Sequence, residues 1–252
     1  MSQFYPKNLV VFIFLILALS CGTTLANADK SDSLSIVPFD PLEKYNRRIH
    51  ALNKSADTLT LRPASQIYGT SVPQAIRLSA SNFYGNLQEP KRFTNHVLQR
   101  EFVKASNDLS RFVLNSSVGL LGLFDVASLI NLFPEETNFD ETFAYWDVPA
   151  GPYLEVPLFG PSSVRGSIGL LTDYSFNPLL FLSGQLSGLS FVTFEALNIV
   201  NERYEYSHIF DSLLYESSDS YSSIRLTYIQ KDINIRSKNR NPDFELFDPS
   251  DF

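Results

Sequence analysis

The chain contains a single cysteine, Cys21, directly behind an apolar run. Without a second cysteine it cannot form an internal disulfide, so an oxidising compartment would leave no mark on the fold. The stretch Ala18-Leu19-Ser20-Cys21 resembles a bacterial lipobox, in which the cysteine becomes the lipidated first residue of the mature protein, although Ala18 stands where leucine is usual. We therefore predict that Cys21 is a lipid-attachment point.

The residues before Cys21 have the layout of an export signal. Lys7 supplies a positive charge and Leu9–Leu19 supply an apolar stretch, about half as long as a membrane-spanning helix. A second cleavage site competes, because Ala26-Asn27-Ala28 fits the pattern of the ordinary signal peptidase. Residues 1–20 are predicted to be a signal peptide, with 28 as the alternative end, and in that alternative Cys21 is discarded on export.

The other reactive side chains form no recognisable catalytic or metal-binding pattern. Asp40, Asp125 and Asp140 have no visible partner, and we interpret them as helix caps and turn ligands. No G-x-S-x-G elbow, P-loop or dinucleotide fingerprint occurs, so we expect neither an enzyme nor a cofactor. Three histidines lack neighbours at metal-ligand spacing and are interpreted as packing or surface residues: His50, His96 and His208.

Composition limits the classes of partner. With 44% apolar and 19% charged residues the chain can bury a core, and its net charge of −7 without a Lys/Arg-dense stripe excludes nucleic acid. The polar, small residues 21–39 predict a tether, and residues 40–236 suit one domain. Residues 237–252 are predicted to be a disordered tail, with docking to a partner protein as the alternative.

Apolar spacing indicates the helices that must position the polar residues. Asp40-Pro41-Leu42-Glu43 predicts a helix start, with Asp40 as cap, proline in the first turn and Glu43 returning a bond. Further helices are predicted after Asn86 and over Phe102–Phe112, whereas glycine and proline interrupt Gly151–Pro161. Since period-two alternation is scarce, we predict a mainly α fold.

Two segments are unusually poor in charge. Val113–Pro134 contains one charged residue, Asp125, and Tyr174–Phe194 contains none. Three interpretations stay open: a buried core pair, a surface that lies in one membrane leaflet, or a spanning helix. Asn177 and Pro178 lower the hydropathy of the second segment and speak against a span.

Seven sequence blocks follow one another from Asp40 to about Asp232: DPLEKYNR at 40–47, LRP at 61–63, VPQAIR at 72–77, NFYGNLQEP at 82–90, NSSVGLLGLFDVA at 115–127, GPYLEVPLFGPSSVR at 151–165 and DSYSSIRLTYIQ at 219–230. In order and spacing they resemble the MlaA/VacJ family. Two positions depart from the family pattern, because Gly166 replaces an aspartate after Arg165, and Ser220 replaces the proline usual after Asp219.

The resemblance implies an outer-membrane, periplasm-facing lipoprotein of Gram-negative bacteria. Such proteins remove misplaced phospholipid from the outer leaflet and pass it to a periplasmic lipid-binding shuttle, beside trimeric porins. The implied fold is a ring of amphipathic helices that lies in one leaflet around a central lipid channel. A lipid needs an apolar edge for its tails and a polar lumen for its head. If cleavage follows Ala28, the protein would associate with the membrane without an acyl anchor.

Within these blocks and close to them we expect two groups of functional residues. Arg47, Arg62 and Arg165 could meet phosphate head groups, with helix capping or pairing to aspartate as the alternative. Glycines in the other group could provide flexibility or close packing. The candidates for the gate and channel wall are Asn53, Asp57, Asn82, Phe83, Asn86, Gly119, Gly122, Phe124 and Asp125.

Two other functions stay open. A scaffold lipoprotein would bind a porin or the cell wall and move nothing. A phospholipid hydrolase would need a nucleophile and a base in contact, and the sequence shows no such pair.

Overall fold

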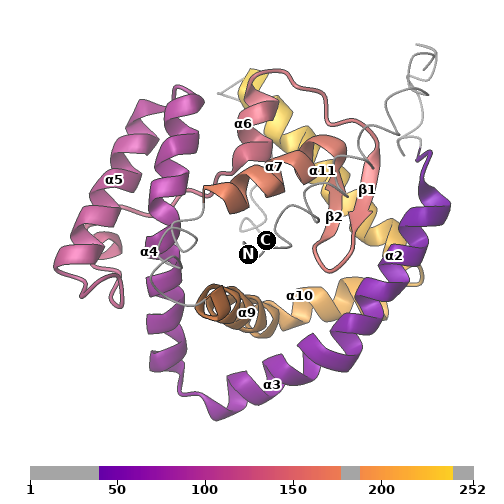
Figure 1. Ribbon diagram of the computed structural model, residues 1–252, viewed down its shortest axis with the longest axis horizontal. Helices are drawn as coiled ribbons and strands as arrows, with labels where there is room; N and C mark the ends of the chain where they lie inside the picture. The colour runs from indigo at the N-terminus through magenta and orange to yellow at the C-terminus, as the bar shows by residue number, and fades with distance from the viewer. Residues whose placement is uncertain (1–39, 177–187, 241–252) are drawn as a thin grey trace, which may run out of the picture. The chain divides into compact units, whose positions relative to one another are not determined.

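A computed structural model describes residues 40–176 and 188–240. The predictions for the leader, the tether, Cys21 and residues 241–252 therefore lie outside the described residues. The described part is mainly helical, which confirms the predicted class (Figure 1). Its elements are α2 Glu43–Ala56, the π-helical turn η1 Asp57–Leu61, α3 Arg62–Ser71, α4 Gln74–Leu98, α5 Phe102–Ser117, the 3₁₀ turn η2 Ala127–Ile130, α6 Phe139–Tyr145, β1 Tyr153–Val156, β2 Gly160–Ser163, α7 Val164–Ser175, α9 Gly188–Glu205, α10 Ser207–Asp211, the π-helical turn η3 Ser212–Glu216 and α11 Ser220–Arg240. Helix α11 thus continues beyond 236.

Helix α2 begins at Glu43, two residues after Pro41, the predicted first helical position. The Asp40 carboxylate accepts a hydrogen bond from the Leu42 backbone N–H at 3.0 Å, in the manner of a cap, and another from the Asn46 side chain at 3.2 Å. Glu43 does not return the predicted bond and instead pairs with Arg47, one turn along, at 2.8 Å. The Asp40 carboxylate therefore anchors the chain directly before helix α2 starts.

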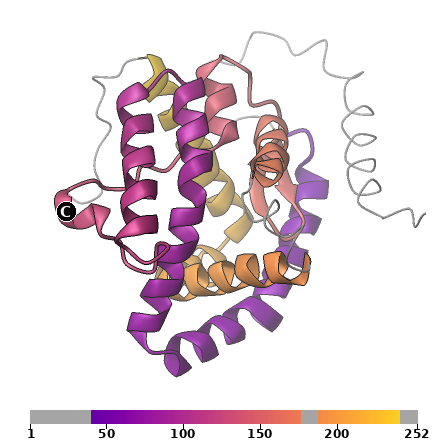
Figure 2. The same cartoon turned by 60° about the vertical axis from the view of Figure 1, so that its left-hand side comes forward.

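Helix α4 differs from its prediction. It begins at Gln74, directly after Pro73, and runs for 25 residues, whereas the pattern predicted a helix only after Asn86. Proline at 73 suits this position, because its fixed φ leads into a helix and the first turn needs no N–H donor. Helix α5 covers the predicted segment, and both views show α4 and α5 side by side (Figures 1 and 2).

The Gly/Pro-rich stretch at 151–161 forms a β-hairpin that the sequence pattern did not predict. Strands β1 and β2 pair antiparallel, with Tyr153 opposite Ser163 and Val156 opposite Gly160. The turn between them is possible because Gly160 adopts a φ of 82°. Ser163 then caps α7 by accepting a hydrogen bond from the Gly166 N–H at 3.0 Å.

Most of the buried residues are polar, and many large apolar side chains are exposed. The largest fully buried side chains are polar, and they include Glu89, His96 and Glu155. By contrast Val103 is 84% exposed and Leu129 is 82% exposed. This distribution is the reverse of a soluble domain, and contiguous exposed apolar surface marks contact with a membrane or a partner.

The same distribution decides between interpretations of the first charge-poor segment, 113–134. Its apolar side chains are exposed by 69% at Leu121 and 60% at Phe133, so the prediction of a buried core is wrong for this segment. The second segment lies largely outside the described residues. Among the helices that the structure describes, none combines the length and hydropathy that crossing a membrane requires.

Candidate functional site

A cavity of about 890 Å³ is lined by residues of α2, η1, α4, the β-hairpin, α7, α9, α10, η3 and α11. We call it the polar cavity, because carboxylates, amides and basic side chains make up much of its wall. His50 and Asp57 line it from α2 and η1, Gln88 from α4, and Glu155 from the hairpin. Residues more than 100 positions apart in the chain thus meet around one space.

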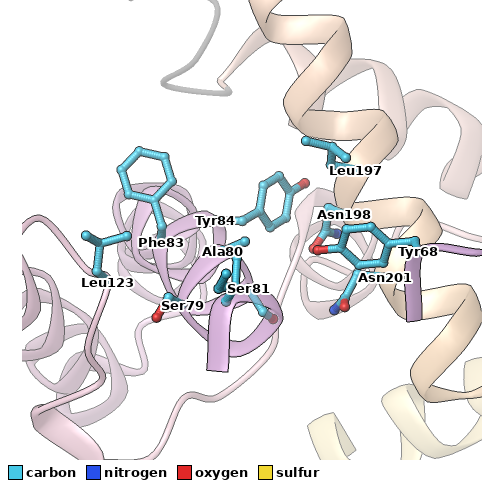
Figure 3. A pocket seen from close by; sticks show the side chains of 11 residues that line it. Tyr68, Ser79, Ala80, Ser81, Phe83, Tyr84, Leu123, Leu197, Asn198 and Asn201 are labelled. Carbon is cyan, nitrogen blue, oxygen red and sulfur yellow. The ribbon is translucent and has the colours of Figure 1, made fainter. Parts of the chain in front are cut away.

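A second cavity of about 370 Å³ adjoins the first, and we call it the apolar pocket. It lies between α3, α4 and α9, beside the turn that follows α5 (Figure 3). Ile76, Phe83 and Leu197 give its wall an apolar character. The residues that line both cavities are Ser81, Tyr84, Asn198 and Asn201.

Tyr84 stands at the junction of the two cavities. Its hydroxyl donates a hydrogen bond to Glu195 Oε2 at 2.9 Å and so connects α4 with α9 (Figure 3 shows its ring between Phe83 and Asn198). Burial and the neighbouring Glu195 carboxylate raise the pKa of the Tyr84 hydroxyl above its usual range. The phenol therefore stays a neutral donor that divides an apolar space from a polar one.

Two predicted wall residues line the polar cavity, and both also hold the fold. The Asn53 side-chain amide donates to the Val156 carbonyl at 3.1 Å and accepts from the Leu158 N–H at 2.7 Å, which fixes the hairpin to α2. The Asp57 carboxylate accepts two hydrogen bonds from Arg203, at 2.8 and 3.1 Å. Asn53 and Asp57 are thus wall residues whose positions depend on distant partners.

The predicted residues on α4 contact the turn that follows α5. Asn82 donates to the Leu123 carbonyl at 3.4 Å, and Asn86 donates to Ser116 Oγ at 2.9 Å. Gly122 has a φ of 93°, and a Cβ added there would lie 2.5 Å from the Asn86 Cβ. A Cβ on Gly119 would lie 2.2 Å from the Phe124 carbonyl oxygen, so the contacts favour close packing at both glycines.

Asp125 belongs to this packed turn. Its carboxylate accepts from Asn115 Nδ2 at 2.9 Å, from Ser128 Oγ at 2.5 Å and from Arg111 at 3.2 Å. Burial disfavours the ionised form, but the hydrogen bonds from Ser128 and Asn115 prevail and lower the pKa of Asp125. Phe83 lines the apolar pocket, whereas neither cavity has a wall residue among Gly119, Gly122, Phe124 and Asp125.

The three predicted head-group arginines are all paired with carboxylates. Arg47 lies 3.0 Å from Asp219, and Arg62 lies 2.9 Å from Asp211. The hydrogen bonds from Arg47 hold the pKa of Asp219 well below its usual range. None of the three lines the polar cavity, so their contacts agree with the pairing interpretation.

Arg165 makes its ion pairs without an aspartate at 166. Its guanidinium lies 2.6 Å from Asp140 and 2.6 Å from Asp232, and its side chain is 1% exposed. It therefore joins α6, α7 and α11 through partners that are distant in sequence. Asp140, interpreted from sequence as a cap or turn ligand, serves here as an ion-pair partner.

The structure also contains a contact that the sequence did not show. Ser220 Oγ lies 3.0 Å from His50 Nε2, and His50 Nδ1 lies 3.1 Å from Glu155. His50 and Glu155 line the polar cavity but Ser220 does not, so the hydroxyl is not presented to that space. We interpret the three residues as a connection between α2, the hairpin and α11.

Sequence reasoning missed much of the polar cavity. Gln88, Lys91 and Arg92 line it from α4, and Glu195 and Glu202 line it from α9. The available signal was the recurrence of polar residues at three-, four- and seven-residue steps, which places them on one face of a helix. That signal identifies a polar face but not the helix that it meets.

These features define a mainly helical protein with many buried polar and exposed apolar side chains and two adjoining cavities, of which the larger is the more polar. The chain belongs to the MlaA lipoprotein family, whose model matches residues 38–234. It is 32% identical over 219 residues to the "Intermembrane phospholipid transport system lipoprotein MlaA" of Escherichia coli (strain K12), with 85% of each chain covered. A protein of the same name from Haemophilus influenzae is 28% identical, with 76% of each chain covered.

A solved structure is similar as well. It is described as "Structural basis for maintenance of bacterial outer membrane lipid asymmetry", and the TM-score is 0.69 at 30% sequence identity. The match covers 79% of this chain and 100% of that one. Sequence and fold therefore agree on the family.

Proposed function

We propose that this protein removes phospholipids from the outer leaflet of the outer membrane and passes them to a periplasmic lipid-binding protein. The observation that carries the proposal is the polar cavity beside the apolar pocket, with Tyr84 and Asn201 in both walls. A phospholipid has an anionic head and hydrocarbon tails, and leaving either part in the wrong medium is costly. Adjoining spaces, one rich in charged and amide side chains and the other almost wholly apolar, suit such a molecule.

The relatives support the same assignment. Those of Escherichia coli and Haemophilus influenzae carry the name of an intermembrane phospholipid transport lipoprotein, and the similar structure concerns outer-membrane lipid asymmetry. On this proposal no covalent step is needed, because mass action of the acceptor protein gives direction to the transfer. The trimeric porin and the periplasmic shuttle are proposed as its partners.

The exposed apolar side chains suggest how the protein sits in the membrane. Side chains such as Leu59, Leu121 and Leu129 are each more than two-thirds exposed, and lipid tails in one leaflet would cover them. In this arrangement the helices form a ring within the leaflet around the polar cavity. Acylation of Cys21 would add a second anchor, and the mass of the mature N-terminus tests that part.

A transfer assay tests the transport proposal. Vesicles with labelled phospholipid would hold the protein and a porin, and a periplasmic acceptor would be added. Transport predicts label in the acceptor only when all components are present. Ala80→Trp, which fills the apolar pocket, should abolish transfer, whereas Ala75→Trp on the same helix but outside the pocket should not.

Two outcomes would contradict this function. A protein that binds the porin but moves no label in any combination would be a scaffold. Cleaved lipid in the acceptor fraction, detected by mass spectrometry, would indicate a hydrolase. In that case His50→Gln should remove the product, because His50 is a histidine in hydrogen-bond contact with a hydroxyl, Ser220 Oγ at 3.0 Å.

A further inference from the structure

The wall of the polar cavity on α4 is made of hydrogen-bond donors. Gln88, Lys91 and Arg92 follow one another at steps of three and one residues and line the cavity together. Gln88 is 6% exposed, and its Nε2 has no hydrogen-bond partner among the described residues. A buried donor without an acceptor is costly, so a ligand oxygen placed there would satisfy a need of the protein itself.

The facing wall on α9 is rich in acceptors, and the strongly basic residue of α9 that lines the cavity, Arg203, is paired with Asp57. Glu195, Asn198 and Glu202 recur at steps of three and four residues, and Asn201 stands next to Glu202. Asn201 is 8% exposed, and its Oδ1 has no partner among the described residues. The hydrogen bond from Tyr84 to Glu195 holds the two walls together. The cavity therefore has a donor wall and an acceptor wall.

Among the described residues that line the polar cavity, acidic side chains outnumber strongly basic ones. The three strongly basic side chains are already paired: Lys91 lies 3.6 Å from Asp173, Arg92 lies 2.5 Å from Glu136, and Arg203 lies 2.8 Å from Asp57. Carboxylates exceed them in number, and a net anionic ligand would meet their repulsion. The lining carboxylates are Asp57, Glu136, Glu155, Glu195, Glu202 and Glu205.

From these observations we propose that the polar cavity selects phospholipid head groups that carry an ammonium group beside the phosphate, over head groups with net negative charge. A phosphate oxygen would accept from Gln88 Nε2, near Lys91 and Arg92. The ammonium group would donate to Asn201 Oδ1 and lie near the Glu202 carboxylate. A glycerol head group has the phosphate that Gln88 would bind, but it lacks the ammonium group that would bind to Asn201 and Glu202.

The acyl chain has a place in the same arrangement. Asn201 also lines the apolar pocket, so an ammonium group bound there would leave the glycerol backbone at the junction of the two cavities. One chain could then enter the space beside Ile76 and Leu197. This inference rests on the proposed function, because it concerns which lipid would be moved.

Competition between two lipids tests the selectivity. The full-length protein in detergent would be equilibrated with equal amounts of dioleoyl phosphatidylethanolamine and dioleoyl phosphatidylglycerol, and bound lipid would be measured by mass spectrometry. We expect about tenfold enrichment of the ethanolamine lipid, the effect of one hydrogen bond to a charged group. Free glycerophosphoethanolamine, added as a competitor, shows whether the head group binds without its chains.

Two variants distinguish the contribution of the α9 wall from that of the α4 wall. Glu202→Gln should reduce the enrichment towards equal recovery, because the ammonium group loses its nearby charge. Gln88→Leu should lower the recovery of both lipids about equally, because both carry the phosphate. Glu216→Gln is the matched control, since Glu216 is an exposed carboxylate that does not line the cavity. Asn201→Leu repeats the test of the acceptor wall with a second residue.

The outcomes distinguish the inference from the proposed function. Equal recovery of both lipids by the unaltered protein, or enrichment of the glycerol lipid, overturns the selectivity. Enrichment that survives both Glu202→Gln and Asn201→Leu overturns its assignment to α9. Recovery of neither lipid speaks against the transport function itself, and the transfer assay would then fail as well.

Discussion

Two regions bury polar groups, and they hold them in different ways. In the α4–α5 pair a buried ion pair joins the two helices, with Glu89 located 2.8 Å from Arg111, and the His96 side chain lies 2.6 Å from Asp108. In the group formed by α2, the hairpin and α11, the central residue is a neutral amide, Asn46. Comparing them shows that a polar interior can be built from ion pairs or from side-chain bonds to backbone.

The two regions also differ in how far apart along the sequence their contacting residues lie. Glu89 and Arg111 lie on consecutive helices, whereas Asn46 bonds the hairpin more than 100 residues along the chain. Removing one partner of a buried ion pair leaves the other charge uncompensated. Removing an amide side chain leaves its former hydrogen-bond partners unpaired, but these groups carry no net charge. Stability should therefore respond more strongly to changes in the α4–α5 pair.

The largest effect is expected for Arg111→Met. Glu89 is 1% exposed, and burial raises the pKa of its carboxyl even though Arg92 and Arg111 oppose the shift. Removing Arg111 leaves that carboxylate under-compensated, which should cost about 3–5 kcal/mol of unfolding free energy at pH 8. Denaturant unfolding in detergent micelles measures the loss.

A double variant is the control for this prediction. In Glu89→Gln combined with Arg111→Met the buried charge is gone, so more than half of the lost stability should return. A double variant no more stable than Arg111→Met alone would show that the charge at Glu89 is not the cause.

A smaller loss is expected for Asn46→Ala in the second region. Asn46 Nδ2 donates to the Tyr153 carbonyl at 3.1 Å, and its Oδ1 accepts from the Glu155 N–H at 3.0 Å. Both backbone groups would be left buried without a partner, at a cost of about 2–4 kcal/mol. Amide hydrogen exchange should show the effect in the hairpin first. A loss larger than that of Arg111→Met would reverse the comparison.

The two regions also differ in how far the sequence predicts them. Apolar spacing is a local property, and it predicted helix α5 and most of α2. The hairpin was missed, because pairing of Tyr153 with Ser163 depends on a turn at Gly160 within a stretch that indicates only interruption. The start of α4 was missed because the apolar spacing indicated a helix only after Asn86, although Pro73 directly precedes its first turn.

The candidate site likewise depends on contacts between distant segments that local patterns do not predict. Asn53 and Asp57, which the family resemblance suggested for the gate and channel wall, line the polar cavity. Gln88 and Glu202 were missed because each is an ordinary polar residue on an amphipathic helix, and they gain meaning only where α4 meets α9. That meeting joins Tyr84 to Glu195 across 111 positions, and no local pattern encodes such a distance.

An intermediate effect is expected for Gly122→Ala, in the turn that closes the α4–α5 pair. Alanine is strained at a φ of 93°, and its Cβ would lie 2.5 Å from that of Asn86, so we expect a loss of about 1–3 kcal/mol. Gly85→Ala is the matched control, since nothing lies within 4 Å of its added Cβ and alanine favours a helix. Thermal unfolding should show opposite shifts, and equal losses would contradict the packing interpretation.

The pH dependence should also separate the two regions. Because the pKa of Glu89 is raised in the folded protein, its contribution to stability is complete below the unfolded pKa of about 4.3 and is lost as the pH rises through the folded value. Glu89→Gln should therefore flatten the decline of unfolding free energy above that pH. Asn46→Ala, which removes no titrating group, should shift the whole curve and leave its slope unchanged.

The smallest effect on stability is expected at the exterior. Leu129 is 82% exposed, so Leu129→Ser should change the unfolding free energy in detergent by less than about 0.5 kcal/mol. The same change removes apolar surface that would face lipid tails, and binding to vesicles should fall several-fold. Ser106→Thr on the exposed side of α5 serves as a control that removes no apolar area. Unchanged vesicle binding after replacing both Leu129 and Val103 would mean that this exterior faces a protein partner and not lipid.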